Sequence, residues 1–131
     1  MAPRHTLSAD ERLKREQSIK TLFQSGKAFS VFPLRVIFAL VPRSDEPSPT
    51  RCGFSAAKKK FKKASDRNRI KRLLRESWRQ RKHGANETVP EEQQLQLFIL
   101  YTATELPTWT SIDEAMEKVV KKLAQPEFFS V

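Results

Sequence analysis

The side chains with the clearest chemistry are cations, and they are concentrated between Arg51 and His83. This stretch holds fourteen Lys and Arg residues against two acids, Asp66 and Glu76. The whole chain of 131 residues has a net charge of +10 and a pI of about 10.1, so the stretch carries more than the entire net charge. A helix face that only meets solvent usually mixes charge signs, because opposite charges three or four residues apart stabilise it. The imbalance therefore indicates a polyanionic partner, either nucleic acid, an anionic membrane surface or an acidic protein.

The spacing within the stretch predicts a helix over residues 66–82 with two different faces. Ile70, Leu74 and Trp78 recur at helical spacing and form an apolar stripe. At 100° per residue, the opposite face presents an amide and four cations, namely Asn68, Lys71, Arg72, Arg75 and Arg79. The planar guanidinium of arginine can bind two phosphate oxygens and can also stack on a base. The lysine clusters at 58–60 and 62–63 precede this helix in a loop and extend its positive surface.

No set of residues has the spacing of a catalytic or metal site. The two histidines, His5 and His83, are far apart and stand in polar surroundings. There is no Cys/His pattern for zinc, and three unclustered glycines cannot form a phosphate-binding loop. We therefore assign no catalytic residue and no metal ligand to the chain. The single cysteine, Cys52, allows no disulfide within the chain, and we expect it to be a small packing residue.

The elements that would position the basic helix follow an α+β pattern. We expect a helix over 15–25 that stops at Gly26, where glycine favours a left-handed end. Strands are predicted over 31–41, after a short one at 27–29, and over 51–57 and 95–101. The near-continuous apolar content of 95–101 predicts a central strand. Ser65 or Asp66 would cap the basic helix, and Ser111 to Glu114 reads as the capping box of a last helix that ends before Pro126. We expect one domain over 1–131, with an ordered core at 12–125 and loose ends at 1–11 and 126–131.

Two motifs resemble those of the bacterial ribonuclease P protein component. They are Gly53-Phe-Ser-Ala-Ala-Lys-Lys59 and Arg67-Asn-Arg-Ile-Lys-Arg-Leu-Leu-Arg75. Weaker similarity extends to Arg12–Lys14, to the segment from Phe23 to Gly26 and to the strands. The resemblance implies a four-stranded mixed sheet with three helices in α-β-β-β-α-β-α order. It also implies a ribosomal-protein-like fold with a left-handed βαβ crossover, an exception to the usual right-handed rule.

The same resemblance implies a role in removing the 5′ leader of precursor tRNA. In that family the protein assists a catalytic RNA, and Mg²⁺ is held by the RNA subunit and the substrate. The positions that match the motifs imply that the RNA subunit is bound by Arg67, Asn68, Arg69, Lys71, Arg72 and Arg75, together with Lys58 and Lys59. A cleft between the first helix and the sheet would hold the leader. Its contacts correspond to Phe23, Phe38 and Ile19, the last at a position often aromatic in the family.

Other interpretations stay open on the sequence alone. A ribosomal-type RNA-binding protein without enzymatic partners would share the fold and the charge. A DNA-binding regulator fits less well, because a strand and a lysine loop, not a helix-turn-helix partner, precede the basic helix. Phe23 and Phe38 could also be ordinary core residues. With no apolar run near the roughly 18 residues of a membrane span, we expect a cytoplasmic protein that binds RNA and has no obligate protein partner.

Overall fold

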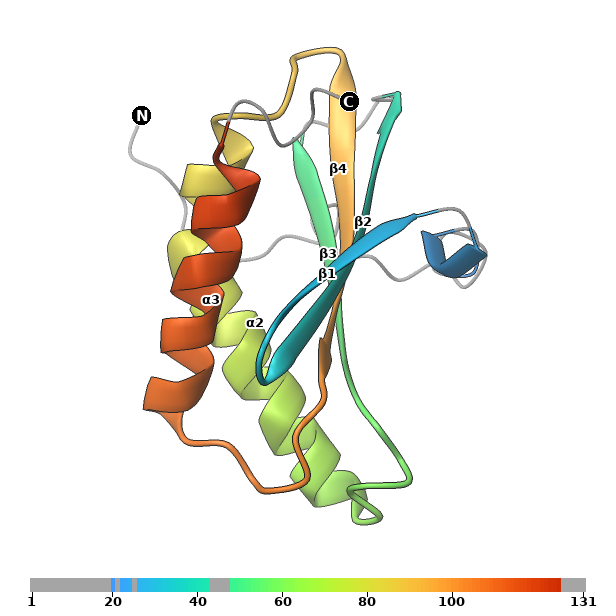
Figure 1. Ribbon diagram of the computed structural model, residues 1–131, viewed down its shortest axis with the longest axis vertical. Helices are drawn as coiled ribbons and strands as arrows, with labels where there is room; N and C mark the ends of the chain where they lie inside the picture. Colours follow the sequence, from blue (N-terminus) through green and yellow to red (C-terminus); the bar gives the residue numbers. More distant parts are fainter. Residues whose placement is uncertain (1–19, 21, 25, 43–47, 126–131) are drawn as a thin grey trace.

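The computed structural model describes residues 20, 22–24, 26–42 and 48–125, which are built around a four-stranded sheet (Figure 1). Its strands are β1 (Lys27–Val31), β2 (Leu34–Pro42), β3 (Thr50–Ala56) and β4 (Gln93–Tyr101), in the spatial order β1-β2-β4-β3. β2 is antiparallel to both β1 and β4, whereas β3 is parallel to β4. The sheet is therefore mixed, as the resemblance implies, and β4 occupies the interior position that its apolar run predicted.

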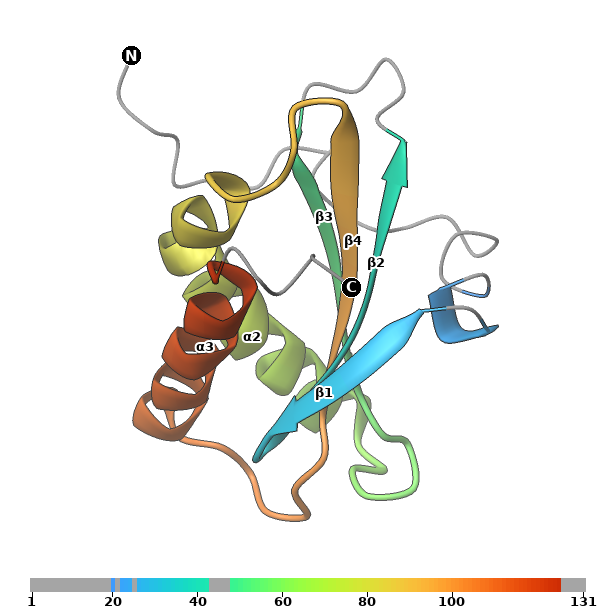
Figure 2. The ribbon, with the colours of Figure 1, turned by 45° about the horizontal axis from the view of Figure 1, so that its top comes forward.

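Two long helices, α2 (Ala64–Asn86) and α3 (Trp109–Leu123), lie together on one side of the sheet (Figure 1). A short helical segment around Leu22 lies on the opposite side, drawn in blue in Figure 2. The α-β-β-β-α-β-α order is thus confirmed. α2 connects the parallel neighbours β3 and β4, and the left-handedness of this crossover stays a prediction.

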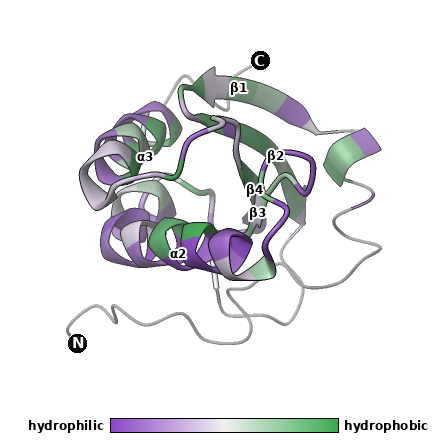
Figure 3. Cartoon of the chain, turned by 90° about the horizontal axis from the view of Figure 1, so that it is seen from below, coloured by the Kyte–Doolittle hydropathy of each residue, from purple (hydrophilic) through white to green (hydrophobic). Residues whose placement is uncertain are grey.

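The main core lies between the sheet and the two long helices, which the end-on view in Figure 3 shows on one side of the strands. Alternate strand residues supply the sheet side of this core, and apolar stripes supply the helix side. Fully buried members are Val36, Leu95, Leu97 and Ile99 from the strands, Ile70, Leu74 and Trp78 from α2, and Ile112, Met116, Val119 and Leu123 from α3. Cys52 is buried here too, as predicted, and its burial raises the pKa of the thiol.

α2 is longer than predicted at both ends. It begins at Ala64, and the residue at its N-cap is Lys63, whose side chain makes no capping hydrogen bond. The expectation that Ser65 or Asp66 caps the helix is therefore wrong. Asp66 instead lies in the first turn, where a carboxylate interacts favourably with the positive end of the helix. The helix continues past 82 because Ala85 is fully buried in the core, and no proline interrupts it before Pro90.

α3 begins one turn earlier than its predicted capping box. Thr108 is the N-cap, and its hydroxyl accepts a hydrogen bond from the Ser111 N–H at 3.1 Å. The Ser111 hydroxyl accepts in return from the Thr108 N–H at 3.2 Å. The predicted box at Ser111–Glu114 was wrong because Thr108, three residues earlier, offers the same hydroxyl chemistry.

The predicted strand over 31–41 is divided between two strands. Val31 pairs with Leu34, and Phe32 and Pro33 form the turn between β1 and β2. Gly26 ends the first helix, but its φ is not positive, so the expected left-handed stop is wrong. Glycine is needed there for space, since a Cβ would lie 2.5 Å from the Leu22 carbonyl oxygen.

Candidate RNA-binding surfaces

The exposed side of α2 carries one amide and four cations that together we call the basic face: Asn68, Arg69, Lys71, Arg72 and Arg75. All are exposed except Lys71, which is half-buried. Ile70 and Leu74, which are neighbours of these residues in the chain, are completely buried in the core. The division of α2 into an apolar side and a basic side, predicted from the sequence, is therefore confirmed.

The cations of the basic face have no acidic partners among the residues that the structure describes. Arg69, Lys71, Arg72 and Arg75 make no side-chain hydrogen bond or ion pair with any of those residues. Arginines later in the helix are different, because Arg79 pairs with Glu76 and Arg81 with Asp113. The hydrogen bond from Arg79 lowers the pKa of the Glu76 carboxyl. Free positive charge is thus concentrated in the first half of α2.

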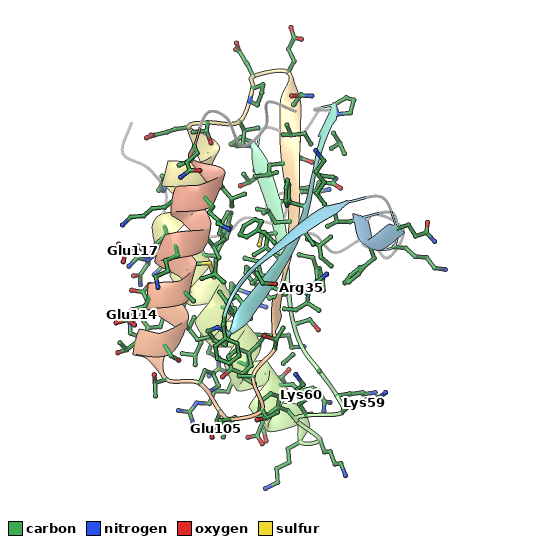
Figure 4. The ribbon with its side chains drawn as sticks, in the orientation of Figure 1. Arg35, Lys59, Lys60, Glu105, Glu114 and Glu117 are labelled. Carbon is green, nitrogen blue, oxygen red and sulfur yellow. The ribbon has the colours of Figure 1, made fainter. Side chains whose placement is uncertain are left out.

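Arg67 holds the lysine loop, which we define as residues 57–63, against the start of α2. Its Nη1 donates to the backbone carbonyls of Phe61 and Lys62 at 2.7 and 2.9 Å. The Phe61 ring is buried and lies 5.9 Å from the Tyr101 ring, centroid to centroid. Lys58 and Lys59 are exposed, and Figure 4 shows Lys59 at the lower end of the molecule. The two lysines therefore precede the N-terminal end of α2, the half of the helix that carries the basic face.

The opposite side of the sheet presents an aromatic pair. Phe23, 48% exposed, lies 5.2 Å from Phe98 in an edge-to-face arrangement. Leu22 packs beside them on Ile37, which is the register partner of Phe98. Because paired residues of antiparallel strands point to the same face, Phe23, Ile37 and Phe98 share this surface.

Phe38 does not share that surface, and the expectation that it forms one cleft with Phe23 is wrong. It follows Ile37, so its side chain points to the helix side of the sheet. There it is 9% exposed and packs edge-to-face on Phe29 at 5.7 Å. Phe38 is therefore a core residue, which was the alternative interpretation of the sequence. Ile19 lies outside the described residues.

Sequence reasoning missed the aromatic partner of Phe23. Phe98 lies in β4, for which the near-continuous apolar run predicted only a central position in the sheet. The signal was the alternation of Gln94, Gln96, Phe98 and Leu100 with Leu95, Leu97 and Ile99. A strand with polar residues at alternate positions has one face less buried than the other, and here that is the face with the aromatic pair.

No group of three His, Cys, Asp or Glu side chains that could hold a metal ion occurs within 20, 22–24, 26–42 and 48–125. Among the helices of this same part of the chain, none is long and apolar enough to cross a membrane. Two features of the described surface suit RNA: cations without a described partner on one side of the sheet, and the half-exposed ring of Phe23 beside Phe98 on the other.

Comparison with known proteins agrees with this picture. The family model described as Ribonuclease P matches residues 7–124. A relative from Porphyromonas gingivalis, a ribonuclease P protein component, is 38% identical over 128 residues, covering 93% of this chain and 89% of the relative. The fold is similar to that of the RNase P protein of Staphylococcus aureus, with a TM-score of 0.65, 21% identity and coverage of 85% of this chain and 93% of that one. For the protein from Thermotoga maritima the TM-score is 0.64 at 22% identity, with 86% and 96% covered. By sequence and by fold, this chain belongs to the ribonuclease P protein family.

Proposed function

We propose that this chain is the protein subunit of the ribonucleoprotein endonuclease that removes the 5′ leader from precursor tRNA. The observation that carries the proposal is the basic face of α2, whose cations have no acidic partner among the described residues, in a chain of the ribonuclease P family. A ribosomal-type binder would explain the charge equally well, but the family relationship favours the processing enzyme. The partners are then the catalytic RNA subunit and precursor tRNA.

The basic face would bind the RNA subunit by electrostatics and hydrogen bonds. In the free protein, Lys71, Arg72 and Arg75 repel one another, at a cost of a few tenths of a kcal/mol for each neighbouring pair. An RNA backbone laid along the helix turns this repulsion into attraction, and each guanidinium can bind two phosphate oxygens. Asn68 adds an amide that can hydrogen-bond a base edge, a ribose hydroxyl or a phosphate. Cations between two RNAs also screen the repulsion between them.

The aromatic pair on the opposite side of the sheet would hold the single-stranded leader. Stacking of an unpaired base on an exposed ring such as Phe23 is worth roughly 1–3 kcal/mol and tolerates any base. That tolerance suits leaders whose sequences differ from one precursor to the next. This assignment replaces Phe38 by Phe98 as the partner of Phe23.

The bond that breaks is a phosphodiester of the RNA substrate, and we assign the catalytic centre to the RNA subunit. Activation of water and stabilisation of the leaving oxygen are the chemistry that Mg²⁺ held by the RNA and the substrate would supply. The protein would bind both RNAs, orient the leader and support the affinity of the RNA for metal. We expect it to work in the cytoplasm without an obligate protein partner.

The test is reconstitution of leader removal. The protein is mixed with a bacterial ribonuclease P RNA and 5′-labelled precursor tRNA, at a Mg²⁺ concentration too low for the RNA alone. We expect saturable cleavage at the mature 5′ end as protein is added. Tight RNA binding without any cleavage would favour the ribosomal-type binder instead.

A further inference from the structure

A pocket of about 620 Å³ lies beyond the end of the sheet, away from both surfaces described above. Its walls are the β1–β2 turn, the segment 103–108 and one side of α3 at Ser111, Glu114 and Lys118. The volume is within the range of small-ligand sites, about 300–1,000 Å³. The pocket therefore has room for a group the size of a nucleobase with its sugar.

The pocket is bordered by large apolar side chains that the fold leaves in solvent. Phe32 is 80% exposed and Leu106 is 48% exposed, and both line the pocket. Trp109, 38% exposed, begins α3 directly after the pocket-lining residues Pro107 and Thr108. Elsewhere in the described part of the chain, the only comparable side chain is Phe23. An exposed phenyl ring in the lining of a pocket is a platform for a flat ligand.

Thr102 joins this pocket to the lysine loop. The Thr102 N–H and hydroxyl both donate to the Pro33 carbonyl, at 2.8 and 3.0 Å, which positions the turn that carries Phe32. The carbonyl of Thr102 accepts a hydrogen bond from Lys60 Nζ. Figure 4 shows Lys59 and Lys60 at the same lower end of the molecule as Glu105, a residue of the pocket. Phosphates on the lysine loop and a base in the pocket can therefore belong to one strand.

The charges in the pocket decide which part of a nucleotide enters it. Two carboxylates, Glu105 and Glu114, and one cation, Lys118, line the pocket, so its net charge is negative and disfavours a phosphate. The carboxylate oxygens accept hydrogen bonds from the N–H groups of a base. The exposed cations Lys58 and Lys59 lie outside, where phosphates would be attracted. An apolar peptide would gain nothing from these lysines. The combination of an aromatic platform, acceptors within and cations outside fits an unpaired nucleotide.

We propose that this pocket binds an unpaired nucleotide of the RNA subunit, with its base stacked on Phe32 and its neighbouring phosphates on the lysine loop. The RNA subunit is the expected source because the lysine loop leads directly into the basic face of α2. The inference rests on the proposed function, which assigns that face to the RNA subunit. It adds a second, base-stacking contact to an interface otherwise made by cations.

The test compares substitutions of Phe32 in the full-length protein. The affinity for a bacterial ribonuclease P RNA is measured by filter binding at one fixed salt concentration. Phe32→Ala should weaken binding by about 5- to 150-fold, the factor that roughly 1–3 kcal/mol of base stacking gives. Phe32→Leu, which is apolar but offers no ring, should lose as much, whereas Phe32→Trp should bind within about twofold of wild type. Because Phe32 is exposed, all three variants should be folded, with urea midpoints close to that of wild type.

The results separate the possible occupants. Retained affinity in Phe32→Leu would overturn the inference in favour of an apolar contact. Unchanged affinity in Phe32→Ala would overturn it altogether, and a loss confined to precursor tRNA would remove the assignment to the RNA subunit. The wild-type protein tests the proposed function separately: if it fails to bind the RNA subunit, the proposed function fails, whatever the Phe32 variants show.

Discussion

At the scale of single residues, α2 separates folding from binding within a few positions. Leu74 is completely buried, while Arg72, two residues earlier, is exposed and makes no pair with a described residue. Neither residue type alone decides this, because leucine also occurs on surfaces and arginine can be buried in ion pairs, as Arg81 partly is. Position on the helix decides which residue stabilises the fold and which remains free for RNA.

Substitutions at these two positions should therefore differ in effect. Leu74→Ala should lower the free energy of unfolding by about 2–5 kcal/mol, because it leaves a cavity in the core. Arg72→Ala should change it by no more than about 0.5 kcal/mol, as is usual for exposed sites. Urea denaturation measures both. Equal losses of stability in the two variants would show that the faces of α2 are wrongly assigned.

Substitutions of Phe23 and Phe38, the two phenylalanines that the resemblance assigned to the leader, should differ in their effect on leader affinity. Phe23→Ala should weaken binding of a single-stranded leader oligonucleotide by about 5- to 150-fold, since an exposed stacking ring is lost. The control is Phe38→Leu, which changes an aromatic residue on the helix side of the sheet. It should cost up to about 1.5 kcal/mol of stability and leave leader affinity unchanged. Fluorescence anisotropy of a labelled oligonucleotide provides the measurement, and a loss of affinity only in Phe38→Leu would refute the assignment.

At the scale of elements, Arg81 connects the two long helices through ion pairs with Asp113 at 2.8 Å and with Glu117 at 3.8 Å. Arg81 of α2 donates from Nε and Nη2 to the two carboxylate oxygens of Asp113 in α3, both at 2.8 Å. The Ser77 hydroxyl donates to the same carboxylate at 2.8 Å. These donors, the Arg81 guanidinium first, lower the pKa of Asp113. The charged carboxylate is therefore the form that holds α3 against α2.

This pair should give the protein part of its stability against acid. Because the pKa of Asp113 is lower in the folded state, its contribution is complete above the unfolded value of about 3.9 and is lost as the pH falls toward the folded value. Asp113→Asn should remove this part of the pH dependence of unfolding. Urea midpoints measured between pH 6 and pH 3 would show a shallower fall than in wild type.

Arg81→Gln provides the matched test of the same pair. It removes the main donor, so it should flatten the acid dependence as well. The double variant should lose less stability than the sum of the two single losses, because both changes break one interaction. Strictly additive losses would show that Asp113 and Arg81 act independently.

The elements themselves were largely predictable, because helix α2 and strand β4 have strong patterns of spacing. The face on which each β2 residue lies was not. Leu34, Val36, Ile37 and Phe38 form an almost continuous apolar run, since β2 is covered by helices on one side and by the Leu22 segment on the other. Because apolar and polar residues do not alternate in this run, the sequence does not show which residues point to which face of the sheet. A shift of one residue in the strand would exchange the two faces. That ambiguity explains the misplacement of Phe38.

The site was predictable where it depends on a helix and not where it depends on tertiary contacts. Lys71, Arg72 and Arg75 follow from helical spacing alone, whereas Arg79, predicted on the same face, is paired with Glu76. The role of Arg67 in holding the lysine loop requires knowledge of where the Phe61 and Lys62 carbonyls lie. Likewise, the Thr102 junction joins residues 42 and 69 positions apart in the chain, and no local pattern reports such contacts.

At the scale of the whole molecule, the charge is polarised. The residues outside 51–83 hold eleven cations and thirteen acids, so they are close to neutral. RNA binding should therefore depend on a few phosphate contacts and not on the general charge of the protein. Each contact releases counterions from the RNA, so the affinity should fall steeply as salt rises.

Removal of one contact should reduce that salt dependence by a definite amount. Arg75→Ala should lower the slope of log affinity against log salt concentration by about 1 if Arg75 binds a phosphate. Lys121→Ala is the matched control, because it removes the same charge from an exposed site on α3 where Lys121 pairs with Glu117. Its slope should equal that of wild type. Equal reductions in both variants would mean that only net charge matters.

The most informative single measurement is the protein concentration that gives half-maximal leader removal by a bacterial ribonuclease P RNA at low Mg²⁺. It should be made for wild type, for the Arg72→Ala/Arg75→Ala double variant and for Lys121→Ala. If the basic face of α2 binds the RNA subunit, the double variant will need at least about tenfold more protein, the effect of losing 1.4 kcal/mol of binding. It will reach the same maximal rate, and Lys121→Ala will behave as wild type. A double variant that saturates at the wild-type concentration would contradict the assignment of this face to the RNA subunit.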